Sequence, residues 1–187
     1  TFRQVLGILK LIKDLKPDVL SVAGGPNVSS FPRETLELSN LDFAIRGEGE
    51  DAIVELINCI ESGQDLSQIS GLVWRKDGQI VINKERKLKT NLDEICFPNW
   101  QALPVYSYYD VFTQYRHFAT MIATRGCPFN CTFCDRENRM GRHWRSRSPQ
   151  NIIEEIKIHQ GRFKIFEFMF FDDNFVTNKD WVFKFCD

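Results

Sequence analysis

The order of apolar and polar positions in the first part of the chain predicts helices alternating with buried strands. Residues 1–15 repeat apolar side chains at steps of three and four, which predicts an amphipathic helix. The apolar run "DVLSVAGGP" follows and closes on paired glycines, as a buried strand does when it ends in a tight turn. We therefore expect a helix and then a strand before residue 26.

The same alternation continues to Gly63. "PRETLELSN" predicts a helix, "LDFAIRGEGE" a second strand that ends in glycines, and "EDAIVELINCIESG" a helix that stops at Gly63. Buried strands with glycines at their carboxyl ends are typical of a doubly wound parallel α/β sheet, which is Rossmann-like or flavodoxin-like. The first half of such a sheet does not precede these elements, so we expect the chain to be part of a longer protein.

The pattern changes after residue 63 and returns to alternating elements after residue 116. "GLVWRKDGQIVIN" holds two short alternating runs around Asp77-Gly78, which predicts a β-hairpin. The rest of residues 64–116 is rich in aromatic residues without a helical period, and we interpret this segment as a connector packed on the surface of both neighbours. Residues 117–187 run strand, helix, strand, helix, with Ser148 as a helix N-cap, and predict the opening of a (β/α) barrel.

Composition narrows the classes of function. Of the 187 residues, 43% are apolar and 26% charged, and the net charge of −1 gives no electrostatic reason to expect binding to nucleic acid or an anionic membrane. No apolar run approaches the length that spans a bilayer, and no signal peptide is visible. We therefore expect a cytoplasmic protein whose thiols stay reduced, which favours metal or redox chemistry over disulfides.

One short stretch holds half of the chain's six cysteines: "ATRGCPFNCTFCD" contains Cys127, Cys131 and Cys134. A zinc site usually takes four ligands from two pairs, but no second C-x2-C pair exists here, although His143 is available as a fourth ligand. Iron–sulfur clusters are held by thiolates, commonly four, so three from one loop would leave one iron open to bind and activate a ligand. The other three cysteines are scattered, and we expect them to serve packing.

The segment "CPFNCTFC", with Phe133 before its last cysteine, resembles the C-x3-C-x2-C motif of the radical SAM superfamily. The resemblance implies that Cys127, Cys131 and Cys134 ligate a [4Fe–4S] cluster whose open iron is chelated by S-adenosylmethionine. An electron from a reduced flavodoxin or ferredoxin would then cleave that molecule to a 5′-deoxyadenosyl radical. In this chemistry the protein binds, orients and shields the cofactors.

Two later segments resemble the cobalamin-dependent branch of that superfamily. "RSRSPQNIIEEI" is similar to the segment after the cluster loop, and "FFDDNF" to an acidic motif at the end of the second barrel strand. This resemblance makes Asp172, Asp173 and Asn174 candidate contacts of S-adenosylmethionine, with a helix cap or a barrel salt bridge as the structural alternative. For Arg145 and Arg147 we expect a structural role, for example pairing with Glu154, rather than an anion contact.

The N-terminal half resembles the end of a B12-binding domain and its linker to a radical SAM barrel. The matching segments are "SVAGGPNVSSFPRETL", "DFAIRGEGE" and "LDEICFPNW". The resemblance implies that the strand-end loops border the nucleotide tail of cobalamin, and their residues are Gly24, Gly25, Gly47, Glu48, Gly49 and Glu50. The two glutamates are equally suited to the positive end of a helix. The family's D-x-H-x-x-G loop is absent, so cobalamin is expected of the intact protein only.

The resemblance as a whole implies a cobalamin-dependent radical SAM enzyme that methylates, cyclises or rearranges an unknown small molecule. The expected domains are a partial B12-binding domain (1–63), a connector with a β-hairpin (64–116) and the start of a radical SAM barrel (117–187). A radical SAM methylthiotransferase is the rival enzyme, but it needs a second cluster that Cys59 and Cys96 do not form. A non-catalytic zinc-binding module is the rival from another class.

Overall fold

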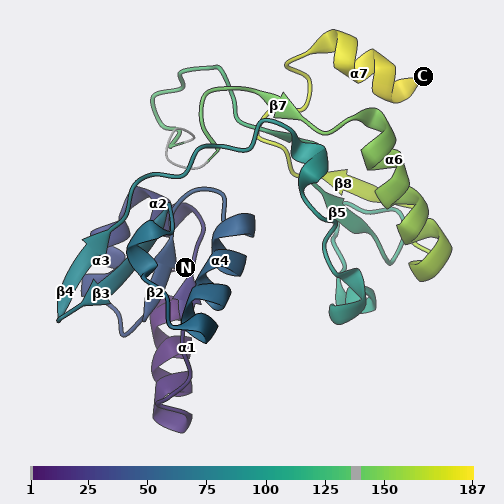
Figure 1. The fold of residues 1–187 in the computed structure, drawn as a ribbon. Helices are drawn as coiled ribbons and strands as arrows, with labels where there is room; N and C mark the ends of the chain where they lie inside the picture. The colour runs from purple at the N-terminus through teal and green to yellow at the C-terminus, as the bar shows by residue number, and fades with distance from the viewer. Residues whose placement is uncertain (1, 136–139) are drawn as a thin grey trace. The chain divides into compact units, whose positions relative to one another are not determined.

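The computed structural model describes residues 2–135 and 140–187, and its contacts divide them into two units (Figure 1). The first unit contains residues 2–88 together with the described residues of segment 132–140. The second contains residues 89–131 and 141–187. Each unit is described by itself.

The first unit is built on one mixed sheet with the strand order β1-β2-β3-β4. Its strands are β1 (Val22–Ala23), β2 (Phe43–Ile45), β3 (Leu72–Lys76) and β4 (Gln79–Ile82). Strands β1 and β2 are parallel, as predicted, whereas β3 pairs antiparallel with β2, Ala44 lying opposite Val73. The parallel pair therefore continues into an antiparallel edge.

That edge is the hairpin predicted from the sequence. Asp77 and Gly78 form its turn with φ angles of 49° and 76°, the left-handed conformation that tight hairpin turns require. The hairpin extends the sheet of the first unit by pairing β3 with β2, whereas residues 89–116 belong to the second unit. The connector was expected to pack on the surface of both neighbours, but its hairpin instead joins the sheet of the first unit through backbone hydrogen bonds. The expected domain boundaries stay a prediction.

Helices cover both faces of this sheet, because successive residues of a strand point to opposite sides. The helices are α1 (Phe2–Leu15), α2 (Pro26–Ser30), α3 (Pro32–Glu37) and α4 (Glu50–Ser62). On one face Leu56 of α4 packs with Ile45 and Leu72, and on the other Leu36 of α3 packs with Ala44 and Val73. Helix α4 ends where predicted, at Gly63 in the left-handed conformation.

A single carboxylate connects α1 to the beginnings of β1 and β2. Asp42, just before β2, accepts hydrogen bonds from Lys13 of α1 (2.8 Å) and from the backbone N–H (2.7 Å) and hydroxyl (2.6 Å) of Ser21. Burial alone would raise the pKa of Asp42, but the hydrogen bonds from Lys13 and Ser21 outweigh it and lower that pKa below 3.8. The ionised carboxylate therefore stabilises the fold at neutral pH.

Replacing this carboxylate by an amide, Asp42→Asn, should lower the free energy of unfolding at pH 7 by about 1–3 kcal/mol, since hydrogen bonds to a charged group are lost. The pKa of Asp42 is lower in the folded state than in the unfolded state. Its contribution to stability is therefore present at pH values above the unfolded-state pKa and is lost as the pH falls through the folded-state pKa. The wild-type and variant stabilities should therefore converge below pH 3.8, in urea titrations at a series of pH values. A difference that persists unchanged in acid would contradict this assignment.

The second unit opens with a parallel β-α-β unit, as predicted. Its strands are β5 (Ala119–Met121), β6 (Thr124–Arg125), β7 (Arg145–Ser146) and β8 (Phe168–Phe170), and its helices are α6 (Pro149–Ile158) and α7 (Lys179–Cys186). Strand β5 pairs parallel with β8, and α6 flanks them (Figure 1). Short 3-10 turns of this unit lie at Leu92–Glu94, Trp100–Ala102 and Val105–Ser107, and a π turn follows α6 at His159–Phe163, whereas the 3-10 turn at Leu66–Gln68 belongs to the first unit.

Helix α6 begins as its sequence predicts. The hydroxyl of Ser148 accepts the N–H of Asn151 at 3.2 Å, and Pro149 occupies the first turn. Ile152 of this helix packs against Met121 and Trp181.

Arg147 is held by Glu155, not by Glu154. Its Nη1 lies 2.6 Å from the Glu155 carboxylate, which is 2% exposed and also accepts the indole N–H of Trp100 at 3.2 Å. Glu155 lies three residues after the buried Ile152 and so shares its inward face, whereas Glu154 is exposed. The structural role expected of Arg147 is present, with the neighbouring residue as its partner. Arg145 donates to the carbonyl of Lys89 at 2.6 Å.

No helix in the described parts of the chain combines the length and the apolar character needed to cross a bilayer.

Candidate metal centre

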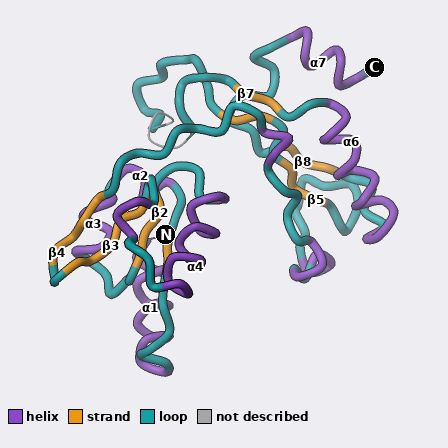
Figure 2. Tube along the Cα trace, in the orientation of Figure 1, coloured by secondary structure: helices purple, strands orange, loops and turns teal. Residues whose placement is uncertain are grey.

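The cysteine loop leaves the second unit through β6 and returns through β7. These strands pair antiparallel, Thr124 opposite Ser146 and Arg125 opposite Arg145. Beside this ladder the N–H of Arg147 donates to the carbonyl of Ala123 at 2.9 Å. The two ends of the loop are thus fixed to each other, and β7 marks its return in Figure 2. We call this pairing of β6 with β7 the neck of the loop.

Gly126 lets the two sides of the neck approach each other closely. It adopts a φ of +81°, and a Cβ atom at this position would overlap the carbonyl oxygen of His143 and lie 3.1 Å from that of Gly141. The next residue, Cys127, donates its N–H to the Gly141 carbonyl at 3.3 Å. Only glycine fits a site that combines positive φ with such close backbone approach. The first cysteine therefore starts from a fixed backbone position.

The three cysteines differ in exposure and stay apart in this structure. Cys127 is half-buried, Cys131 and Cys134 are exposed, and all six cysteines are described and lie outside disulfides. Among the described residues, no three His, Cys, Asp or Glu side chains converge as they would around a metal ion. Cys127 and Cys131 belong to the second unit, and Cys134 to the segment grouped with the first.

The chemistry of the donor set fits an iron–sulfur cluster. Three reduced thiols lie in eight positions of one loop, and thiolates are the ligands that such clusters use. His143, the alternative fourth ligand, has an exposed side chain and approaches Gly126 through its backbone carbonyl. Phe133 is 90% exposed, so its side chain is available to cover a group bound in the loop.

The acidic residues after β8 lie at the carboxyl end of the strand pair, where barrel enzymes place function. Asp172 Oδ1 accepts the backbone N–H groups of Ala123 (3.1 Å) and Thr124 and the hydroxyl of Thr124 (2.6 Å). Burial raises the pKa of Asp172 above its ordinary value, although these hydrogen bonds oppose the rise. Asp173 is exposed, and Asn174 accepts the indole N–H of Trp144 through its backbone carbonyl at 3.1 Å.

In the first unit the two glycine loops meet. Gly24 and Gly25 follow β1, and the N–H of Gly47, which follows β2, donates to the hydroxyl of Ser29 in α2 at 3.0 Å. Gly25 and Gly47 have φ angles of 92° and 72°, which glycine adopts without strain. Ser29 was not singled out from the sequence, because a serine one turn into a short helix carries no local signal.

Glu48 and Glu50 differ in their surroundings. Glu48 is 8% exposed, whereas Glu50 is the first residue of α4, directly after its cap, Gly49. The positive end of a helix dipole favours a carboxylate in the first turn. Glu50 therefore lies where the alternative role, stabilising the start of a helix, requires it.

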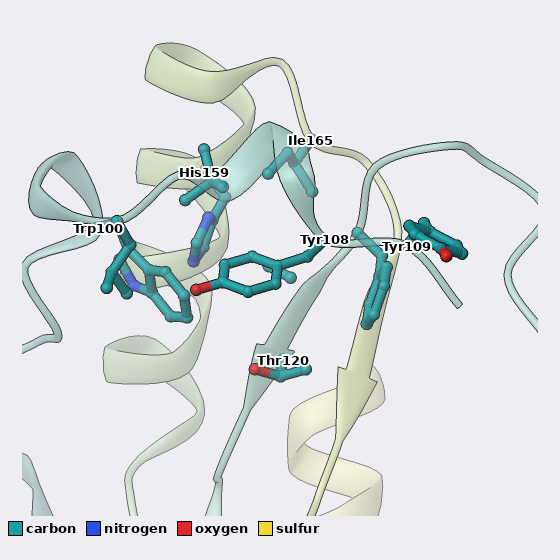
Figure 3. A pocket seen from close by; sticks show the side chains of 10 residues that line it. Trp100, Tyr108, Tyr109, Thr120, His159 and Ile165 are labelled. Carbon is teal, nitrogen blue, oxygen red and sulfur yellow. The ribbon is translucent and has the colours of Figure 1, made fainter. Parts of the chain in front are cut away.

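The second unit also contains a cavity of about 410 Å³ that no sequence motif predicted (Figure 3). Trp100, Tyr108, Tyr109 and the buried His159 line it, next to the beginning of β5. Burial lowers the pKa of His159, although the nearby Glu155 charge opposes this, so the imidazole is neutral at pH 7. The cysteine loop lies beyond the opposite, carboxyl end of β5, so this cavity is separate from the candidate metal centre.

Fold and site together define an α/β protein that carries a thiol-rich loop beyond the carboxyl end of a barrel strand. Residues 121–186 match the Radical SAM superfamily, and residues 1–57 match the B12 binding domain. The chain belongs to the radical SAM proteins that carry a B12-binding domain.

Individual relatives agree with this assignment. The chain is 35% identical over 173 residues to an uncharacterized methyltransferase, PH0819, of Pyrococcus horikoshii, covering 92% of this chain and 37% of that protein. It is 26% identical over 184 residues to an anaerobic magnesium-protoporphyrin IX monomethyl ester cyclase of Rubrivivax gelatinosus, covering 96% and 33%. The chain thus spans about a third of the length of these relatives.

Among solved structures, the chain superposes on the cobalamin-dependent S-adenosylmethionine radical enzyme OxsB, solved with aqua-cobalamin and S-adenosylmethionine bound. The TM-score is 0.78 at 20% identity, over 98% of this chain and 26% of that one. This similarity confirms the expected fold, a Rossmann-like B12-binding part followed by the start of a radical SAM barrel.

The close packing at Gly126 generates a test. Gly126→Ala should prevent the loop from closing, because the new methyl group overlaps the His143 carbonyl, and the iron bound per chain after anaerobic reconstitution should fall to about a tenth or less. Gly63→Ala is the matched control, since Gly63 also has a positive φ of 66° but has open space around it. Equal iron binding by both variants would show that the close backbone approach at Gly126 is not needed for the loop to hold iron.

Proposed function

We propose that the protein is a cobalamin-dependent radical SAM enzyme acting on a small molecule. The supporting observation is a C-x3-C-x2-C thiol loop beyond the carboxyl end of β5, with its ends fixed at a neck. In the proposal Cys127, Cys131 and Cys134 hold a [4Fe–4S] cluster and leave one iron open for S-adenosylmethionine. When bound and reduced, the cluster supplies the electron that cleaves S-adenosylmethionine to the 5′-deoxyadenosyl radical.

The chain's own contribution is to present the thiolates and to keep water from the reaction. The neck fixes Cys127, whereas Cys131 and Cys134 are exposed and can converge when a cluster forms. Metal binding commonly supplies the free energy that orders such a loop, because the ligands gather only around the metal. We assign the exposed Phe133 the role of covering the cluster after this convergence.

Of the three candidates after β8, we propose Asp173 and Asn174 as contacts of S-adenosylmethionine. The carboxylate of Asp172 already accepts the backbone N–H groups of Ala123 and Thr124. Asp173 and Asn174 follow β8 at the carboxyl end of the strand pair, and the exposed Asp173 carboxylate suits an ammonium group.

We assign the glycine loops to cobalamin. Gly24, Gly25, Gly47 and Gly49 lie at the ends of parallel strands, where doubly wound sheets bind ligands, and glycine lets backbone approach a bulky ligand closely. The contact of Ser29 with Gly47 holds the two loops side by side. Glu48 and Glu50 complete the second loop of this proposed site.

Both methyl transfer and oxidative cyclisation or rearrangement fit the proposal, because the relatives include proteins named as a methyltransferase and a cyclase. We propose a reduced flavodoxin or ferredoxin as the electron donor and the cytoplasm as the compartment, since reducing conditions keep the thiols available. The near-neutral net charge of −1 gives no reason to propose nucleic acid as a substrate.

The proposal is tested by electron paramagnetic resonance on the full-length protein, reconstituted anaerobically with iron and sulfide and then reduced. A [4Fe–4S]⁺ signal that changes shape when S-adenosylmethionine is added would show an open iron that takes a ligand. Bound zinc without iron, or a cluster that ignores S-adenosylmethionine, would refute it and leave a structural or electron-transfer site.

Substitutions identify the ligands. Cys127→Ala, Cys131→Ala and Cys134→Ala should each abolish the signal and the cleavage of S-adenosylmethionine, because each removes one of three protein ligands. Cys59→Ala, Cys96→Ala and Cys186→Ala are the matched controls and should keep the wild-type iron content. Loss of the cluster in a control variant, or its retention in a loop variant, would contradict the assignment.

A further inference from the structure

The carboxylate of Asp172 lies where the first barrel strand breaks. The parallel ladder between β5 and β8 ends with the N–H of Phe171 donating to the carbonyl of Met121 at 2.9 Å. Beyond it the chain pairs with β7 through Thr124, so the strand changes partners across Ile122 and Ala123. A change of partner leaves backbone groups without a ladder at the break.

These backbone groups are buried and cannot reach water. Ala123 is 0% and Thr124 2% exposed. A buried N–H without a partner costs about 1–3 kcal/mol, so each must find an acceptor. Asp172 accepts both, and it also accepts the Thr124 hydroxyl at 2.6 Å. The carboxylate therefore replaces the missing ladder.

From this geometry we infer that Asp172 is a positioning residue, which fixes the strand leading into the cysteine loop and does not contact S-adenosylmethionine. Its consequence for catalysis rests on the function proposed above. Oδ1 takes three donors, and Oδ2 adds a contact of 3.3 Å with the Ala123 N–H. A carboxylate oxygen offers about two lone pairs, so the backbone and hydroxyl donors occupy Oδ1 fully, and the Ala123 N–H takes part of Oδ2.

The position of Thr124 determines the position of Cys127, the first proposed iron ligand. Only Arg125 and Gly126 separate Thr124 from Cys127. Arg125 lies opposite Arg145 in the ladder between β6 and β7, and Gly126 is fixed by its close backbone packing. A shift at Thr124 thus moves the Cys127 thiol relative to the other two. The adjacent acidic residues consequently differ, since the Asp172 carboxylate holds backbone whereas the Asp173 side chain is exposed.

The test compares Asp172→Asn with its matched control Asp173→Asn, which makes the same charge change one residue away. Backbone hydrogen exchange is measured by mass spectrometry with fragmentation, together with bound iron and the S-adenosylmethionine concentration that half-converts the paramagnetic signal. A neutral amide oxygen accepts hydrogen bonds more weakly than a carboxylate oxygen, so Asp172→Asn should speed exchange at Ala123 and Thr124 by about tenfold or more. It should lower bound iron and leave the half-conversion concentration of the loaded protein unchanged. Asp173→Asn should instead leave exchange and iron unchanged and raise the half-conversion concentration, because Asp173 is a proposed contact of S-adenosylmethionine.

Unchanged exchange and iron content in Asp172→Asn, with a half-conversion concentration raised about tenfold, would overturn the inference and make Asp172 a cofactor contact. Thr124→Val covers the case in which Asp172→Asn does not fold, because it removes only the hydroxyl donor. It should speed exchange at Thr124 about threefold, and no change there would also overturn the inference. A wild-type cluster that ignores S-adenosylmethionine would refute the proposed function instead, while the exchange data would still decide the role of Asp172.

Discussion

Backbone N–H groups that lie next to strands but outside their ladders need another acceptor, and this requirement shapes both units of the protein. In each case a side-chain oxygen from a distant part of the chain satisfies it. Asp42 accepts the N–H of Ser21, Ser29 accepts that of Gly47, and Asp172 accepts those of Ala123 and Thr124. The bond between Asp42 and Ser21 lies before β1 and β2, whereas the bonds of Ser29 and Asp172 lie at the carboxyl ends of strands and fix the loops from which a ligand there would be held.

The cysteine loop combines a fixed base with two exposed thiols beyond it. Its neck is closed by backbone pairing and by the close approach at Gly126, whereas Cys131 and Cys134 are exposed. This division suits a site whose cofactors perform the chemistry, since the protein then has to aim its ligands and let the cluster gather the rest.

Much of the fold could be predicted because its signals are local. The Asp77-Gly78 turn, the Ser148 cap and the end of α4 at Gly63 each depend on residues within one turn of each other, and the structure confirms all three. The partner of Arg147 was predicted wrongly, because choosing between Glu154 and Glu155 requires knowing which side of α6 faces inward. The antiparallel pairing of β3 with β2 was missed for a similar reason, since strand partners are chosen across the sheet.

The sequence by itself determined the chemistry available to this protein: three thiols at fixed spacing, glycines after strands and an acidic pair after the second barrel strand. Only the tertiary structure decided where these groups lie, as it brought the Asp172 carboxylate to the backbone of Ala123 and Thr124 and placed the Asp173 side chain at the surface. The physical reason is that residue type and spacing are properties of the chain. Pairing and burial, in contrast, depend on which distant backbone groups folding brings within hydrogen-bonding distance.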